Sequence, residues 1–128
     1  MKVKKVVNIY GETSGVTSET ALSLNVGSET GKSYYTVPQG WKLKIYEVDA
    51  WGDGETWFYL RAGTSTTATD NPKYRAFKLA SNGHLDRSYH MPLIIEATSA
   101  DVYVFLTVNQ STANPAGIGL HGELEKLA

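Results

Sequence analysis

The stretch PLIIEATSADVYVFLTV, residues 92–108, carries the strongest structural signal in this sequence of 128 residues. Two runs rich in β-branched and aromatic residues, 92–98 and 102–108, lie on either side of the polar break Ser99-Ala100-Asp101. Two such runs around a short polar turn are typical of a β-hairpin. The sequence therefore predicts two strands here, at 92–98 and 101–109, joined as a hairpin.

The second of these runs is apolar on both of its faces. Its even-numbered positions from 102 to 108 are all aliphatic, and its odd-numbered positions include Tyr103 and Phe105. A strand with one face in water alternates between apolar and polar residues. We therefore expect an apolar neighbour on each side of this strand. In so small a protein, the second neighbour can be another subunit.

Strand candidates recur along the whole chain, with turn residues between them. They cover 2–10, 21–26, 32–37, 41–50, 55–62, 73–80, 92–98, 101–109 and 118–124. No window of eleven or more residues keeps apolar side chains at helical spacing. Eight or nine short strands without helices predict an all-β, antiparallel β-sandwich, in which few strand edges are exposed. We expect residues 1–128 to form a single domain of this kind.

Two details favour a jelly-roll-like sandwich. The breaks between strand candidates differ greatly in length, which suits Greek-key crossovers better than an up-and-down meander. The strand that begins at Trp41 also changes face. Leu43 and Ile45 keep the parity of Trp41, whereas Tyr46 and Val48 take the other one. A β-bulge or a sheet-to-sheet corner produces such a switch.

Composition excludes several classes of function. The net charge of −1 leaves no strong field to attract nucleic acid or an anionic membrane. The chain has no cysteine, and its apolar runs are far below membrane-spanning length. The basic start lacks the apolar stretch of a secretory signal. We therefore expect a soluble protein, made in a cytoplasm and complete without processing.

The sequence gives no reason to expect an enzyme or a cofactor. It contains no nucleophile motif, no P-loop and no dinucleotide-binding glycine pattern. His84, Asp86 and His90 share a strand parity, but such a strand segment spans roughly 20 Å, too far for one ion to reach all three. We therefore interpret this segment as loop and turn, and we expect no metal there.

A second polar group lies around Gly52 and Gly54. Asp49, Asp53 and Glu55 offer oxygen ligands at short spacing. Calcium needs six to eight oxygens, and the regular ladder of an EF-hand loop is missing. A glycine-bearing hairpin turn accounts for the same residues, and we prefer that interpretation.

The middle of the chain is unusually aromatic. If Phe58 and Leu60 face the core, then Trp57, Tyr59 and Arg61 face outward. Outward aromatic residues beside an arginine are typical of protein interfaces. They also suit stacking against sugar rings. The remaining alternative is that both faces of this strand are covered within one chain.

Three segments follow patterns that occur together in one group of known proteins. The run YTVPQGWKLKIYEV, residues 35–48, resembles the opening strand of small β-sandwich proteins from phage and archaeal-virus capsids, decorations and tails. Residues 91–97 with 102–108 are similar to their late hairpin, and 118–124 to their closing strand. The resemblance implies self-assembly or docking on a shell lattice, and it implies no catalytic residue.

The leading hypothesis is therefore a non-enzymatic structural protein, a viral capsid or decoration protein that forms homo-oligomers or docks on other particle proteins. It would be made in the host cytoplasm and end in the virion. The expected contact residues are Trp57, Tyr59, Tyr103 and Phe105, with Lys2, Lys4 and Lys5 as a basic arm. The alternative is a lectin-like carbohydrate-binding module. Its expected ligand residues are Trp41, Trp51, Asp49 and Asp53.

Overall fold

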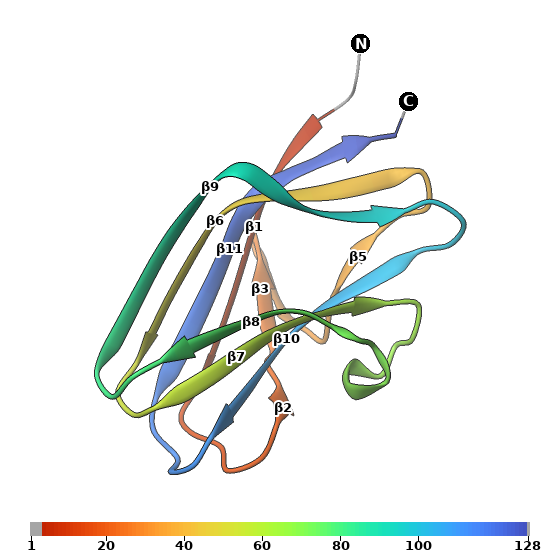
Figure 1. The fold of residues 1–128 in the computed structure, drawn as a ribbon. Helices are drawn as coiled ribbons and strands as arrows, with labels where there is room; N and C mark the ends of the chain where they lie inside the picture. The colour runs from red at the N-terminus through yellow and green to blue at the C-terminus, as the bar shows by residue number, and fades with distance from the viewer. Residues whose placement is uncertain (1–3, 128) are drawn as a thin grey trace.

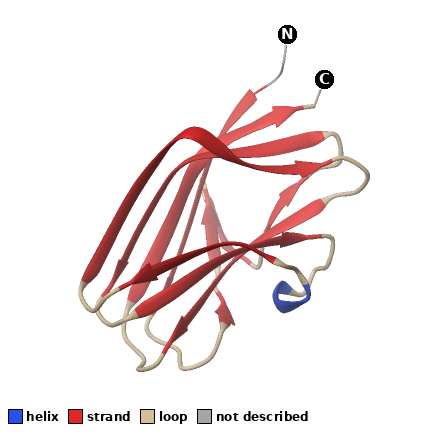
Figure 2. Cartoon of the chain, in the orientation of Figure 1, coloured by secondary structure: helices blue, strands red, loops and turns tan. Residues whose placement is uncertain are grey.

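The computed structural model describes residues 4–127, and these residues form eleven strands and one short 3-10 turn. Figure 2 shows how completely strands dominate the chain. The elements are β1 (Lys4–Thr13), β2 (Thr20–Ala21), β3 (Leu24–Val26), β4 (Glu29–Lys32), β5 (Tyr35–Val37), β6 (Trp41–Gly52), β7 (Thr56–Gly63), η1 (Ala68–Asp70), β8 (Lys73–Leu79), β9 (Gly83–Ala97), β10 (Val102–Gln110) and β11 (Ala116–Lys126).

Two antiparallel sheets pack face to face (Figure 1). The six-stranded sheet has the order β4-β3-β1-β11-β6-β9, and the five-stranded sheet contains β2-β10-β7-β8 with β5 also paired to β10. Four pairs are nested in the sequence: β7 with β8, β6 with β9, β5 with β10, and β1 with β11. This nesting is a long hairpin rolled into two layers, which is the wrap of a jelly roll. The prediction of a jelly-roll-like antiparallel sandwich is confirmed.

The core lies between the two sheets, as the alternation of each strand requires. On β7, Phe58 and Leu60 are fully buried while Trp57 and Tyr59 are only half-buried. On β10, the even-numbered residues from Val104 to Val108 are buried in the same core. Burial of such strand faces supplies the main favourable free energy of folding.

The predicted hairpin between residues 92–98 and 101–109 is wrong. Both strands exist, but β9 pairs with β6 in one sheet and β10 pairs with β7 in the other. The inner side chains of β9, such as Leu93 and Ile95, and those of β10, such as Leu106, line the same core from opposite sheets. The polar break is therefore a crossing between sheets. The glycine-bearing turn after Gly52 also crosses between sheets, from β6 to β7, so it is not a hairpin turn either.

Several strand boundaries also differ from those predicted. The segment that contains His84, Asp86 and His90 is the first half of β9 and not a loop. It escaped prediction because its charged and polar side chains lie on an exposed edge strand. The candidates 21–26 and 32–37 each divide in two, so the count rises from eight or nine to eleven.

The face switch in β6 is confirmed. The register shifts between Ile45 and Glu47, so that Tyr46 has no partner on β9 or β11. Ile45 and Val48 can therefore both face the core although their parities differ. On the neighbouring strand, Gly122 lies opposite Ile45, where an added Cβ would collide with the carbonyl oxygen of Lys44. The bulge therefore requires a residue without a side chain on β11.

Candidate functional surfaces

The outer face of the five-stranded sheet carries the predicted aromatic residues of β7. Trp57, Tyr59 and Arg61 alternate with core residues and point away from the core, as predicted. The ammonium group of Lys73 lies 3.9 Å from the Tyr59 ring centroid, and that of Lys78 lies 5.3 Å from the Trp57 ring. A cation over an aromatic face is held there by a favourable electrostatic attraction. We call Trp57, Tyr59, Lys73 and Lys78 the aromatic face.

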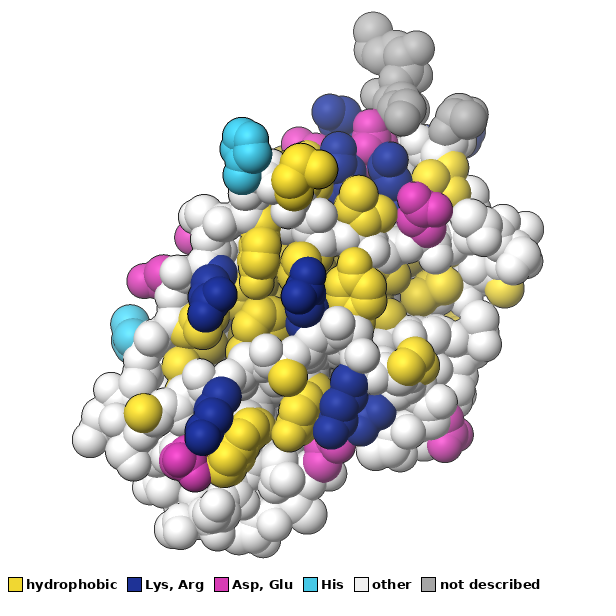
Figure 3. Space-filling model, in the orientation of Figure 1, with side chains coloured by type: hydrophobic (Ala, Val, Ile, Leu, Met, Phe, Trp, Pro, Cys, Tyr) yellow, Lys and Arg dark blue, Asp and Glu magenta, His cyan; other side chains and the backbone are white. Residues whose placement is uncertain are grey.

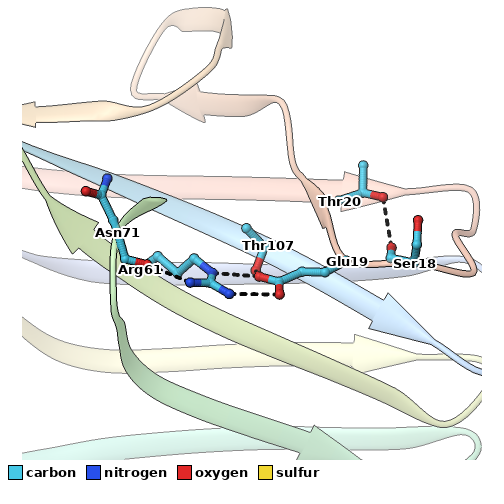
Figure 4. A network of polar contacts seen from close by, with 6 residues as sticks. All are labelled: Ser18, Glu19, Thr20, Arg61, Asn71 and Thr107. Carbon is cyan, nitrogen blue, oxygen red and sulfur yellow. Dashed lines mark hydrogen bonds and ion pairs between the residues drawn. The ribbon is translucent and has the colours of Figure 1, made fainter. Parts of the chain in front are cut away.

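A carboxylate clamp fixes one side of this face (Figure 4). Arg61 donates two hydrogen bonds to Glu19, Nε to Oε2 at 2.6 Å and Nη2 to Oε1 at 2.9 Å. The Thr107 hydroxyl also donates to Glu19, at 2.6 Å, and Arg61 Nη1 donates to the carbonyl oxygen of Asn71. The hydrogen bonds from Arg61 are the main reason that the pKa of Glu19 is lowered, and in return the pKa of Arg61 is raised. The clamp ties the segment before β2 onto β7 and β10.

The second apolar face of β10 is covered within the same chain. The Tyr34 ring lies 4.7 Å from the Tyr103 ring and 5.5 Å from the Phe105 ring, measured between centroids. Phe105 is only 2% exposed in the single chain, so the expectation that it contacts another subunit is not met. The apolar neighbour that the sequence predicts on the outer face of β10 is therefore Tyr34, which directly precedes β5. Tyr103 remains half-buried at the surface.

A shallow hollow of about 190 Å³ lies on the outer face of the six-stranded sheet. Two glycines of β11 make room for its walls: a Cβ on Gly117 would lie 2.5 Å from the Tyr10 hydroxyl, and one on Gly119 would lie 2.5 Å from Asp49 Oδ1. Trp51 Nε1 donates to the Tyr10 hydroxyl at 3.1 Å, which holds the two rings together. The hollow thus unites Trp51 and Asp49, two of the predicted ligand residues.

Histidines complete this hollow. The two ring nitrogens of His121 lie 2.8 Å from Asn8 Oδ1 and 3.3 Å from Asp49 Oδ1. His84 and Asp86 line its β9 side. Within residues 4–127, no group of three or more His, Cys, Asp or Glu side chains could hold a metal ion.

The other predicted residues do not line either surface, although Asp53 lines a depression beside the hollow together with Trp51 and His84. Trp41 is half-buried against the core, and Asp53 sits in the exposed turn between β6 and β7, where its N–H bonds the carbonyl oxygen of Pro115. Lys4 and Lys5 are exposed at the start of β1, with the Lys4 ammonium 4.0 Å from Glu123. Lys2 lies outside the described residues.

Sequence patterns did not reveal four residues that matter here: Glu19, Tyr34, Tyr10 and His121. Glu19 lies in an irregular segment, where no periodicity indicates a partner, and Tyr34, inside the strand candidate 32–37, lies between β4 and β5 and not in a strand. Tyr10 and His121 are far apart in the sequence and meet only because β1 pairs with β11. The glycines at 117 and 119 were the one available signal, since alternate glycines in a strand indicate a close approach from that face.

Comparison with known proteins adds no relative to this description. No protein-family model matches the chain, and no curated protein matches it. Among the described residues, none of the helices has the length and apolar character needed to span a membrane.

Proposed function

We propose that this chain is a non-enzymatic structural protein whose copies assemble with one another or dock on a larger particle. The observation that carries the proposal is the aromatic face. Trp57 and Tyr59 stand half-buried beside Lys73 and Lys78 on the outside of the sandwich. Tryptophan and tyrosine supply much of the binding energy at protein interfaces. The aromatic face, with Tyr103 at its margin, would be the contact surface.

We further propose that the particle is a viral shell or its decoration, so that the protein made in a host cytoplasm ends in the virion. The jelly-roll wrap supports this proposal, since capsid proteins commonly use it. Lectins and cupins have the same wrap, so the surface residues are stronger evidence for the function than the fold is. Electron microscopy of native source material, labelled with an antibody against the chain, tests the location directly. If the antibody label is found only on free protein and not on particles, the proposed location in the virion is contradicted.

The assembly contact is tested by light scattering and sedimentation at micromolar concentration. We expect the natural chain to form oligomers, and Trp57→Ala combined with Tyr59→Ser to shift it toward monomers. A standard interface removes about 1,200–2,000 Å² from water, and its aromatic anchors often contribute about 2 kcal/mol or more each.

Tyr46→Ser is the matched control for this test. Tyr46 is also a half-buried aromatic residue with a lysine ammonium near its ring, Lys44 at 5.8 Å, but it lies on the other sheet. We expect this variant to assemble like the natural chain. A natural chain that stays strictly monomeric in solution and does not bind native particles would contradict the proposal.

A second candidate function, carbohydrate binding, is favoured by one observation: the hollow joins an indole, a phenol, carboxylates and imidazoles. Trp51 and Tyr10 offer ring faces and edges, while Asp49 and Asp86 offer acceptors for sugar hydroxyls. A volume of about 190 Å³ is below the usual range for drug-sized ligands, so it suits a single sugar ring.

A chain with Trp41→Phe and Trp57→Phe leaves Trp51 as the sole tryptophan, because the sequence has three. Its emission is then titrated with a panel of glycans. We expect a saturable change for a glycan that occupies the hollow, and its loss in Asp49→Asn. If no glycan in the panel changes the Trp51 emission, carbohydrate binding at the hollow is contradicted.

A further inference from the structure

The sandwich has one flank where two edge strands carry arginines toward the core side. β8 ends the five-stranded sheet and β9 ends the six-stranded sheet. Arg75 lies opposite Leu60, and Arg87 lies opposite Val48, and both of these partners are fully buried. Directly opposed residues of an antiparallel pair share a face of the sheet. The two arginines therefore stand on the inner faces of their sheets, yet both are exposed.

Exposed apolar side chains lie on the same two edge strands. Tyr74 is 43% exposed, Met91 78% and Ile94 37%; these are three of the four large apolar side chains that are exposed among the described residues. The Tyr74 hydroxyl donates to the carbonyl oxygen of Ile94 at 2.8 Å, which bridges β8 and β9. Figure 3 shows hydrophobic side chains interspersed with Lys and Arg over this side of the molecule. We call Tyr74, Arg75, Arg87, Met91 and Ile94 the arginine flank.

No acidic side chain on β8 lies beside the flank, and on β9 Asp86 precedes Arg87 but lies opposite Asp49, on the outer face of the sheet. The sequence from 71 to 85 contains no Asp or Glu. Inward-pointing charges on edge strands discourage pairing with an identical edge. A symmetric contact of two flanks would also bring each arginine against arginines of the second copy. The flank therefore suits an acidic partner surface.

The same molecule carries such a surface on the outside of the six-stranded sheet. Glu12, Glu47, Asp49 and Asp86 lie on three adjacent rows across β1, β11, β6 and β9. These rows contain no Lys or Arg, so four carboxylates gather in a chain whose net charge is only −1. Asp49 and Asp86 are directly opposed, an arrangement in which like charges repel. We call these four residues the acidic face.

We propose that the arginine flank of one copy docks on the acidic face of the next copy. The contact is head-to-tail, so it builds rings or open chains. The flank opens at the edge of the sandwich and the acidic face lies on its broad side, so one copy presents both to two different neighbours. This inference rests on the proposed self-assembly and adds a contact distinct from the aromatic face. With two kinds of contact, assembly can extend in more than one direction.

Charge reversal on each surface tests the contact. Arg75→Glu with Arg87→Glu changes the flank, and Glu47→Lys with Asp86→Lys changes the acidic face. We expect each double variant to weaken self-association at least about tenfold, because like charges then meet across the contact. An equimolar mixture should recover assembly, since the natural flank of one variant meets the natural acidic face of the other.

Lys32→Glu with Lys126→Glu is the matched control. It makes the same net charge change as the flank variant on exposed residues of β4 and β11, and β4 is the edge opposite β9. We expect the control to assemble like the natural chain. Circular dichroism and thermal unfolding verify that every variant folds.

The outcomes separate this inference from the proposed function. A natural chain that assembles, loses assembly with Trp57→Ala and Tyr59→Ser, and ignores both charge reversals overturns the head-to-tail contact alone. A mixture that stays as dissociated as its two components also overturns it. A monomeric natural chain overturns both. Recovery in the mixture, weakened by raising the salt from about 0.05 M to about 0.5 M, supports the contact.

Discussion

Glu19 is the clearest case of a single residue that links separate segments of the fold. Its carboxylate accepts hydrogen bonds from Arg61 on β7 and Thr107 on β10, and its side chain is only 20% exposed. Thr107 is fully buried on the outer side of β10, so the carboxylate is the partner that satisfies its hydroxyl. The clamp therefore covers polar groups that a bare sheet would leave exposed to water.

We expect Glu19→Gln to lower the free energy of unfolding at neutral pH by about 1.5–3 kcal/mol, the range for hydrogen bonds that involve a charged group. Because the pKa of Glu19 in the folded protein is below its usual value of 4.5, the carboxylate stabilises the fold above that value. This stabilisation is lost as the pH falls through the lowered pKa.

Urea unfolding of both proteins from neutral to acidic pH measures the difference between them. We expect it to be largest at neutral pH and to shrink on acidification. Glu29→Gln is the control, because the Glu29–Lys32 ion pair is exposed and should contribute little. A difference that is independent of pH would contradict the assignment to Glu19.

At the scale of the strand, the β6 bulge and Gly122 depend on each other. The unpaired Tyr46 shifts the register of β6, and β11 approaches so closely there that Gly122 has no room for a side chain. The bulge lets Ile45 and Val48 both reach the core. The parity switch in the sequence predicted the bulge, but nothing in the sequence linked it to Gly122.

We expect Gly122→Ala to destabilise the protein by about 1–3 kcal/mol, as overpacking does, because the added Cβ meets the backbone of Lys44. Gly119→Ala on the same strand is the control. Its Cβ meets the carboxylate of Asp49, a side chain that can rotate away, so the cost should be smaller. Thermal unfolding compares the two. Equal losses would show that the backbone contact at Gly122 is not decisive.

Across the whole molecule, the nested wrap pairs the first strand with the last. Lys4 lies opposite Glu125. β6 pairs with β9 although β7 and β8 lie between them in the sequence. Such long-range pairing requires loop closure before any contact is gained, which slows folding. The two apolar faces of β10 illustrate the same dependence on distant segments: one is covered by the opposite sheet, and the other by Tyr34.

We therefore expect refolding on a timescale of milliseconds to seconds, as in other proteins dominated by non-local strand pairs. Stopped-flow tryptophan fluorescence after dilution from urea measures the rate. Repetition at two protein concentrations separates folding from association. A microsecond process that accounts for the full signal change would contradict this view of the topology.

Local patterns were enough to predict the all-β class, the alternation that turns Trp57 and Tyr59 outward, and the face switch at Tyr46. Each of these depends on the pleat of one strand, which repeats every two residues. Strand partners could not be predicted in this way. The expected hairpin between β9 and β10 was wrong because two apolar strands satisfy their patterns equally well side by side or across a core. Long-range packing alone chose between these arrangements, and it also brought Glu19 to Arg61 and Asp49 to His121.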